Sequence, residues 1–175
     1  MSVLKVNQIQ TANGVIMANL NSSGANVGIQ LASNLAPAFR VSPSTTQTIS
    51  HNTLTKVNFG TEQFDTNNNF ASSTFTPTVA GYYQQNYNLA LNAIDGRQYY
   101  FLGYIYVNGN ALYNYEWITT GNAGGRETIN FSEILYLNGT GDYVEVYLYS
   151  YDYTATTSIG LRPNSSWSSS LIRSA

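Results

Sequence analysis

Short runs of tyrosine, valine, isoleucine, phenylalanine and threonine recur along most of this chain, and clusters of asparagine and glycine interrupt them at short intervals. Aromatic and β-branched residues favour extended strands. Asparagine and glycine tolerate the positive φ angles that tight turns require. The pattern therefore predicts an all-β sandwich from Pro37 onward, with no helix.

Eight strands are expected in this region, and they are separated by turn clusters. The strands are predicted at residues 38–41, 54–59, 82–92, 98–107, 112–118, 128–137, 143–151 and 167–172. The turn clusters are Asn67-Asn68-Asn69, Asn108-Gly109-Asn110, 121–125 and 138–141.

Composition divides the 175 residues into an arm, 1–34, and a head domain, 35–175. The arm is poor in aromatic residues. Within it, two mixed runs flank Asn13-Gly14, a dipeptide that favours a hairpin turn, so we expect a small hairpin or a disordered segment. A hairpin this short buries too little apolar surface to be stable alone, and we expect it to become ordered against a partner.

Charge argues against several kinds of partner. Charged residues make up 9% of the chain and the net charge is −2, so uncharged polar side chains must form the surface. The few lysines and arginines form no basic stripe, and we expect no nucleic-acid binding. No apolar run near the N-terminus is long enough for a membrane span or a signal peptide, and we expect no membrane insertion. The chain has no cysteine, which excludes disulfide bonds.

The strand at 143–153 has two different faces. Val144, Val146 and Leu148 alternate with tyrosines and are expected to face the core. The opposite face is a candidate ligand-binding surface, because an aromatic ring stacks on sugar C–H groups while its hydroxyl bonds sugar oxygens. Packing between tyrosines on neighbouring strands, or contact with a neighbouring protein, is the alternative. The candidate residues are Tyr143, Tyr147, Tyr149, Tyr151 and Tyr153.

The strand at 98–107 is apolar on both faces. One face carries Tyr99, Phe101, Ile105 and Val107, and the other carries Tyr100, Leu102, Tyr104 and Tyr106. A two-layer sandwich covers one face of each strand, so we expect the second set to be buried against another subunit. The strand at 128–137 is ambiguous, because Glu133 shares a face with Phe131 and Leu135. A bulge or an ion pair at an interface would explain that placement.

No catalytic constellation is recognisable. His51 is the single histidine and no Gly-x-Ser-x-Gly motif occurs, so we expect His51 to be an ordinary loop residue. The glycine-rich segment 121–125 lacks the lysine of a phosphate-binding loop. We expect no enzyme activity and no cofactor.

Calcium binding would require a cluster of carboxylates, because this ion needs six to eight oxygen ligands. The possible ligands are Asp95, Asp142, Glu145 and Asp152. None of them stands at regular ligand spacing, so no metal site is predicted. Asp142 is expected to accept backbone hydrogen bonds in the turn before its strand.

An ordered set of motifs in the head resembles the globular head of complement component 1q, a relative of the tumour necrosis factor jelly roll. The motifs are Ala38-Phe39-Arg40-Val41, Val57-Asn58-Phe59, Phe64-Asp65, Phe75-Thr76-Pro77, Ala80-Gly81-Tyr82-Tyr83, Leu135-Tyr136-Leu137, 141–146 and Ser166-Trp167-Ser168. The resemblance covers residues 37–175. Gln85 and Trp167 depart from it, each standing where the family usually has phenylalanine, so core or interface packing is expected to differ there.

This resemblance implies a ten-stranded jelly roll assembled as a homotrimer. A trimer agrees with the strand that is apolar on both faces. The residues expected at the trimer interface are Tyr100, Leu102, Tyr104 and Tyr106.

The arm has a resemblance of its own. Residues 4–11, LKVNQIQT, are similar to the opening of bacteriophage tail-fibre and other structural proteins, particularly those of marine cyanobacterial phages. The resemblance implies that Leu4, Val6 and Ile9 attach the arm to other virion proteins. The protein is then expected to assemble in the host cytoplasm and to be exposed on the particle.

The function predicted from these observations is a virion structural protein, a trimeric tail-fibre or knob-like head that binds a host-surface glycan or receptor. One alternative is a capsid or tail decoration protein with a purely structural role. The other is a free lectin-like binding module.

Overall fold

The computed structural model describes residues 8–10, 16–19, 36–93, 96–119 and 126–175. Contacts divide the chain into two units, Met1–Leu35 and Ala36–Ala175. In the first unit, β1 (Gln8–Gln10) pairs antiparallel with β2 (Ile16–Asn19), as the sequence predicts for a hairpin. Ile9 lies in β1 opposite Ala18. Leu4, Val6 and the Asn13-Gly14 turn lie outside the described residues, so the attachment role of the arm stays a prediction.

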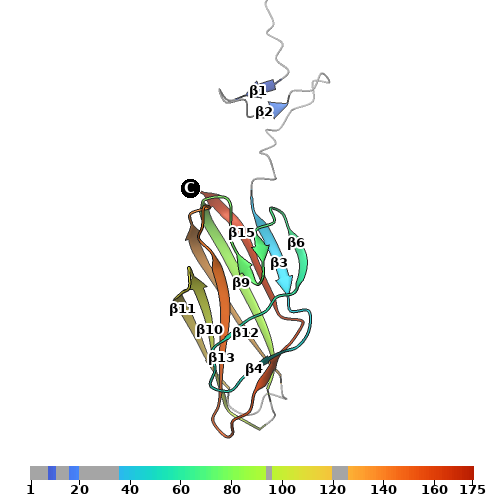
Figure 1. Cartoon of the computed structure of the whole chain (residues 1–175), viewed down its shortest axis with the longest axis vertical. Helices are drawn as coiled ribbons and strands as arrows, with labels where there is room; N and C mark the ends of the chain where they lie inside the picture. The colour runs from blue at the N-terminus through green and yellow to red at the C-terminus, as the bar shows by residue number, and fades with distance from the viewer. Residues whose placement is uncertain (1–7, 11–15, 20–35, 94–95, 120–125) are drawn as a thin grey trace, which may run out of the picture. The chain divides into compact units, whose positions relative to one another are not determined.

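The second unit is a sandwich of two antiparallel sheets (Figure 1). In the six-stranded sheet, β10 lies between β11 and β13, and both β5 and β8 pair with the other edge of β13. Strand β7 continues this sheet beyond β8. The bounds are β11 (Asn110–Ile118), β10 (Tyr99–Val107), β13 (Val144–Asp152), β5 (Thr55–Lys56), β8 (Thr74–Phe75) and β7 (Phe70–Ala71).

The seven-stranded sheet is built around β9, which pairs along one edge with β12 and along the other with β15 and β14. Strands β3 and β6 extend the sheet beyond β15, and β4 extends it beyond β14. The bounds are β9 (Gly81–Asn92), β12 (Arg126–Leu137), β15 (Ser166–Ser174), β14 (Ile159–Leu161), β3 (Ala38–Ser42), β6 (Thr61–Asp65) and β4 (Gln47–Ile49).

Seven of the eight expected strands are confirmed, the one expected at 54–59 is reduced to the two residues of β5, and the observed sheets contain additional short strands. The described residues of the head form 13 strands in two sheets, rather than ten. The five that were not predicted are β4, β6, β7, β8 and β14, each of five residues or fewer. Such short segments lack the repeated alternation by which a strand is recognised. No helix among the described residues is long and apolar enough to cross a membrane.

The core lies between the two sheets and follows the predicted alternation. Val144, Val146 and Leu148 are fully buried, which confirms the aliphatic face of β13 as the core face. Large aromatic residues fill the remaining space. The fully buried ones are Phe39, Phe75, Tyr83, Tyr99, Phe101 and Trp167.

Gln85 and Trp167, the two residues that depart from the family pattern, contact each other in this core. The Trp167 Nε1–H donates to Gln85 Oε1 over 2.9 Å. The other end of the same amide donates to Ser169 Oγ over 2.9 Å. A buried polar atom without a hydrogen-bond partner destabilises a core. Gln85 and Trp167 each supply the partner that the other needs, so the two polar groups can both be buried.

The two sheets meet along one margin through an aromatic cluster on β11 and β12. The Phe131 ring stacks between Tyr87 and Tyr115, with centroids 4.5 and 4.8 Å away. A Cβ atom at Gly103 would lie 2.8 Å from Cε1 of Phe131, so the ring occupies the space that a side chain would need.

Glu133 lies at this margin, and its placement has a simple explanation. The β12 register runs without a bulge, and β12 is an edge strand of its sheet. The inward side chain therefore reaches the rim, where Oε2 of Glu133 accepts the Tyr115 hydroxyl over 2.8 Å. Burial and this hydrogen bond raise the pKa of Tyr115 to about 12. Neither the expected bulge nor an interface ion pair is needed.

Candidate binding surface

The residues predicted for trimer contact and those predicted for ligand binding lie on one face of the six-stranded sheet. Tyr100 on β10 pairs with Tyr151 on β13, and Leu102 pairs with Tyr149. Directly paired residues of an antiparallel ladder point to the same side. We call this face the tyrosine surface, and it consists of Tyr100, Leu102, Tyr104, Tyr106, Tyr147, Tyr149 and Tyr151.

Two of the predicted ligand-binding tyrosines lie outside this ladder. Tyr143 precedes β13, and its N–H donates to the Asn108 side chain over 2.9 Å. Tyr153 follows β13 and packs edge-on against Tyr151, with centroids 5.3 Å apart. Both therefore border the tyrosine surface at opposite ends of β13.

The side chains of the tyrosine surface cover one another. The rings of Tyr106 and Tyr147 lie 4.5 Å apart, and Tyr100 meets Tyr149 edge-on at 6.3 Å. Leu102 is left only 9% exposed, and the tyrosines are half-buried. The chain itself thus supplies part of the burial for which a second subunit was expected. The assignment of Tyr100, Leu102, Tyr104 and Tyr106 to a trimer interface stays a prediction.

The phenol groups of this surface are hydrogen-bonding groups. Burial raises the pKa values of Tyr104 and Tyr147 above the ordinary value for tyrosine. The Tyr149 hydroxyl donates to Asn52 Oδ1 over 2.6 Å, which fixes that ring. The surface therefore presents flat apolar rings together with hydroxyl groups that can both donate and accept.

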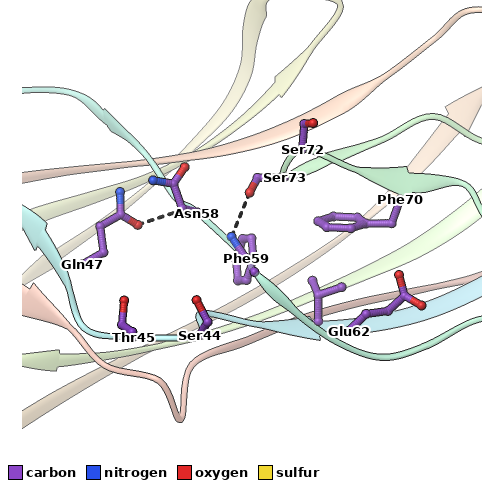
Figure 2. Close-up of a pocket in the computed structure, with 11 residues that line it drawn as sticks. Ser44, Thr45, Gln47, Asn58, Phe59, Glu62, Phe70, Ser72 and Ser73 are labelled. Carbon is purple, nitrogen blue, oxygen red and sulfur yellow. Dashed lines mark hydrogen bonds between the residues drawn. The ribbon is translucent and has the colours of Figure 1, made fainter.

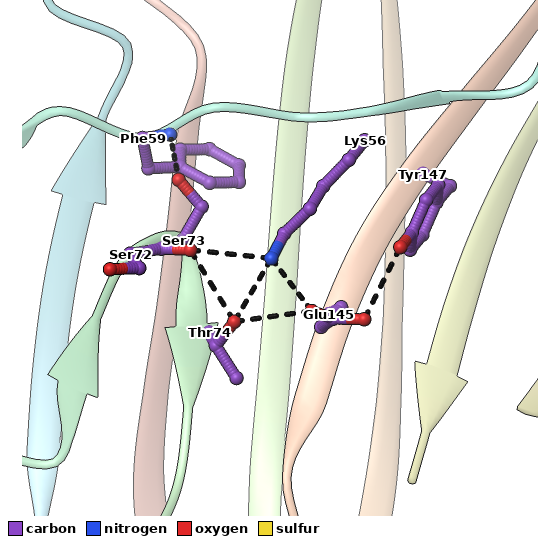
Figure 3. A network of polar contacts seen from close by, with 7 residues as sticks. All are labelled: Lys56, Phe59, Ser72, Ser73, Thr74, Glu145 and Tyr147. Atoms are coloured by element: carbon purple, nitrogen blue, oxygen red, sulfur yellow. Dashed lines mark hydrogen bonds and ion pairs between the residues drawn. The ribbon is translucent and has the colours of Figure 1, made fainter. Parts of the chain in front are cut away.

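An ion pair borders the tyrosine surface (Figure 3). Lys56 on β5 lies 2.6 Å from Glu145 on β13, and the other carboxylate oxygen of Glu145 accepts the Tyr147 hydroxyl over 3.3 Å. Burial raises the pKa of Glu145, but the hydrogen bond and charge of Lys56 outweigh it, so this pKa lies below its ordinary value. Sequence reasoning missed the pair, because its members are 89 positions apart.

His51 and the other carboxylates have structural partners. Nδ1 of His51 accepts the backbone N–H of Asp152 over 3.1 Å, and its ring packs 4.8 Å from Tyr151. Asp142 accepts the Asn138 N–H over 2.8 Å, which is the turn role predicted for it.

The Asp152 carboxylate is buried and lies 2.8 Å from Arg97 Nη1. Burial raises the pKa of this carboxylate. Hydrogen bonds from Thr154, Arg97 and the Ala155 N–H lower it by more, so the pKa falls to about 2. Among the described residues no three histidine, aspartate or glutamate side chains cluster as metal ligands would. Asp95 and the segment 121–125 lie outside the described residues.

The seven-stranded sheet carries an exposed apolar patch that the sequence analysis did not identify. Ile134 and Tyr136 on β12 are 51% and 53% exposed, and Tyr82 on β9 is 46% exposed. The rings of Tyr82 and Tyr136 lie 5.5 Å apart across the paired strands. Ile172 on β15 is 55% exposed. The alternation in β12 could have revealed this patch, because Ile134 and Tyr136 lie on the face opposite the core. Glu133, on the core face, made the alternation ambiguous.

Solved structures with this architecture come from complement and tumour necrosis factor proteins. The globular domain of zebrafish complement 1qA matches with a TM-score of 0.57 and 16% identity, over 79% of this chain and 98% of that one. The tumour necrosis factor Eiger of S. frugiperda matches with 0.55 and 14%, over 81% and 94%. Murine APRIL matches with 0.54 and 10%, over 78% and 99%. No protein-family model matches the sequence, and no curated protein matches it.

These likenesses confirm the predicted all-β jelly roll of the complement 1q and tumour necrosis factor type. They concern the fold alone, because identity is low. None of them bears on the resemblance of the N-terminal arm to bacteriophage proteins.

Proposed function

We propose that this chain is a trimeric binding module of a bacteriophage virion, with a tail-fibre or knob-like head. The arm attaches to other virion proteins, and the head binds a glycan or receptor on the host surface through the tyrosine surface. The protein is not an enzyme in this proposal.

The observation that carries the binding role is the tyrosine surface. Its rings come from adjacent strands of a single sheet and are held by contacts with one another. Aromatic rings with free hydroxyl edges bind sugars and protein surfaces at a small entropic cost, because few rotatable bonds must be fixed. The virion role is inferred from the sequence of the arm, 4–11, which resembles phage structural proteins.

Two faces are candidates for the contact between subunits. The sequence analysis favours Tyr100, Leu102, Tyr104 and Tyr106. Burial favours the apolar patch formed by Tyr82, Ile134 and Tyr136, whose side chains are about half exposed. Exposed apolar side chains gathered on one face are typical of protein interfaces. We assign the subunit contact to this patch, which leaves the tyrosine surface free for a ligand.

The experiment that tests the function compares intact particles with particles that lack residues 37–175. Adsorption to host cells is measured after confirming by electron microscopy that both kinds of particle assemble. Loss of adsorption in assembled particles is the expected result. Normal adsorption would contradict the binding role and favour the decoration protein.

Imaging the intact particle tests the location independently. Density for a trimeric knob at a fibre or tail position is expected. Absence of the chain from purified particles would contradict the virion role and favour a free lectin-like module.

A further inference from the structure

A pocket of about 640 Å³ lies between three loops of the head, and none of its lining residues belongs to the tyrosine surface (Figure 2). Its walls come from the segment after β3, the segment between β5 and β6, and the hairpin that joins β7 to β8. Sites for small ligands commonly have volumes of about 300 to 1,000 Å³. The pocket is therefore large enough for one or two sugar rings.

The apolar part of the pocket is rigid. Val41 and Phe59 are buried. The half-buried Phe70 ring lies 4.9 Å from Phe39 and 5.3 Å from Trp167, so the aromatic core holds it in place. A ligand that reached the Phe70 ring would therefore meet a fixed aromatic surface.

Hydrogen bonds also fix the polar walls. The Gln47 side chain donates to the Lys56 carbonyl over 2.7 Å and accepts the Asn58 N–H over 2.8 Å. One side chain therefore fixes the position of the backbone segment 56–58. Ser73 Oγ accepts the Phe59 N–H over 2.8 Å and ties the hairpin to the same segment. These contacts hold the site in shape before a ligand arrives, which lowers the cost of binding.

The hairpin at the rim has an unfavourable backbone conformation. Ser72 and Ser73, its two central residues, have φ angles of 52° and 58°. Asparagine and glycine normally occupy such positions, because a Cβ atom crowds the backbone there. Strain that persists against local preference is concentrated at functional sites. Here it places one serine hydroxyl on the wall and another at the rim.

The rim offers polar groups that are not used within the protein. In the described part of the chain, the hydroxyls of Ser44, Thr45 and Ser72 make no hydrogen bond, and neither does the Glu62 carboxylate. The described lining contains no lysine, arginine or histidine. The nearby Lys56 ammonium is paired with Glu145 (Figure 3), and the two groups lie 2.6 Å apart. Nothing in the lining would attract an anion.

We propose that this pocket binds a neutral saccharide. The partly exposed Phe70 ring would stack on the C–H face of a sugar ring, and the hydroxyls of Ser44, Thr45 and Ser72 would bond its oxygens. The Glu62 carboxylate accepts strong hydrogen bonds from two sugar hydroxyls, which favours a vicinal diol. This site goes beyond the proposed function, because it is separate from the tyrosine surface.

The test uses the full chain, first on an array of neutral and acidic glycans and then in saturation-transfer NMR with the neutral glycan that binds best. We expect binding to neutral glycans and none to sialylated or sulfated versions of the same cores. Glu62→Gln should weaken binding at least tenfold, and Thr45→Trp should abolish it by filling the pocket. Glu127→Gln, a partly exposed carboxylate on β12 that belongs to neither the pocket nor the tyrosine surface, is the matched control and should leave binding unchanged.

Three results would overturn the proposal. They are the absence of binding to every neutral glycan, binding that survives both pocket variants, and binding that is lost in Tyr151→Ala but kept in the pocket variants. Thermal melting of each variant separates loss of the site from loss of the fold. Particle adsorption tests the proposed function separately, since a head that binds through the tyrosine surface would still adsorb with an empty pocket.

Discussion

A buried amide such as that of Gln85 is stable in a core when both of its ends are paired. Trp167 and Ser169 provide those partners, and all three side chains are buried. Removal of the amide would leave an indole N–H and a hydroxyl without partners, and their desolvation would no longer be compensated.

Gln85→Leu is therefore expected to lower the free energy of unfolding by about 1 to 3 kcal/mol. Urea denaturation measures the change. Gln84→Leu is the control, because Gln84 lies on the outer face of the same strand and is partly exposed. Equal effects of the two substitutions would contradict the role given to the buried amide.

Asp152 makes the stability of the head depend on acidity. Its pKa is about 2 in the folded chain and near 3.8 without these contacts. The ionised form is thus favoured by folding, so its contribution is fully present above pH 4 and is lost as the pH falls from about 4 to about 2.

Asp152→Asn is expected to cost roughly 2 kcal/mol at neutral pH. Thermal unfolding measured from pH 7 down to pH 2 checks this expectation. The difference between the native chain and the variant should shrink over the lowest two pH units. A difference that stays constant over the whole range would show that charge is not the cause.

At the scale of the elements, the sandwich is closed where β11 and β12 approach each other. Gly103 on β10 leaves room for the Phe131 ring, which stacks on Tyr115 of β11. The packing of Phe131 at this margin of the sheet therefore requires that residue 103 of β10 has no side chain.

Gly103→Ala is expected to destabilise the head by about 1 to 3 kcal/mol through overpacking against Phe131. Gly141→Ala provides the control, since a Cβ atom there would meet nothing within 4 Å. Chemical denaturation compares the two variants. Partial recovery in the double variant Gly103→Ala with Phe131→Leu would identify the ring as the cause, and its absence would argue against it.

At the scale of the whole molecule, assembly depends on which face remains apolar after the chain has folded. The tyrosine surface is partly covered by its own rings, whereas Tyr82, Ile134 and Tyr136 remain about half exposed. Low charge leaves few groups that would oppose association, since charged residues are 9% of the chain.

Light scattering should give three times the chain mass of 19.2 kDa. Ile134→Glu is expected to raise the dissociation constant of the trimer at least tenfold, because it places a charge in an apolar contact. Tyr104→Glu, on the tyrosine surface, should leave the trimer intact. The reverse result would return the interface to the residues that the sequence analysis favoured, and a monomeric native chain would contradict the trimer itself.

The sequence alone determined the all-β class, the position of each long strand and the core face of β13. These properties depend on alternation and on turn residues, and both are local. The same pattern identified every tyrosine of the tyrosine surface. Motifs spread over residues 37–175 also indicated the jelly-roll fold.

Only the tertiary structure decided which strands are neighbours, and therefore how the local features combine. The pairing of β10 with β13 merged two predicted sites into one surface. It also supplied part of the burial that was expected from a second subunit, since Leu102, paired with Tyr149, is left 9% exposed. The Lys56–Glu145 pair, the Gln85–Trp167 contact and the pocket lined by Phe70 and Glu62 join residues distant in the chain. Local patterns do not specify such contacts, because they depend on strand order and register across the whole sandwich.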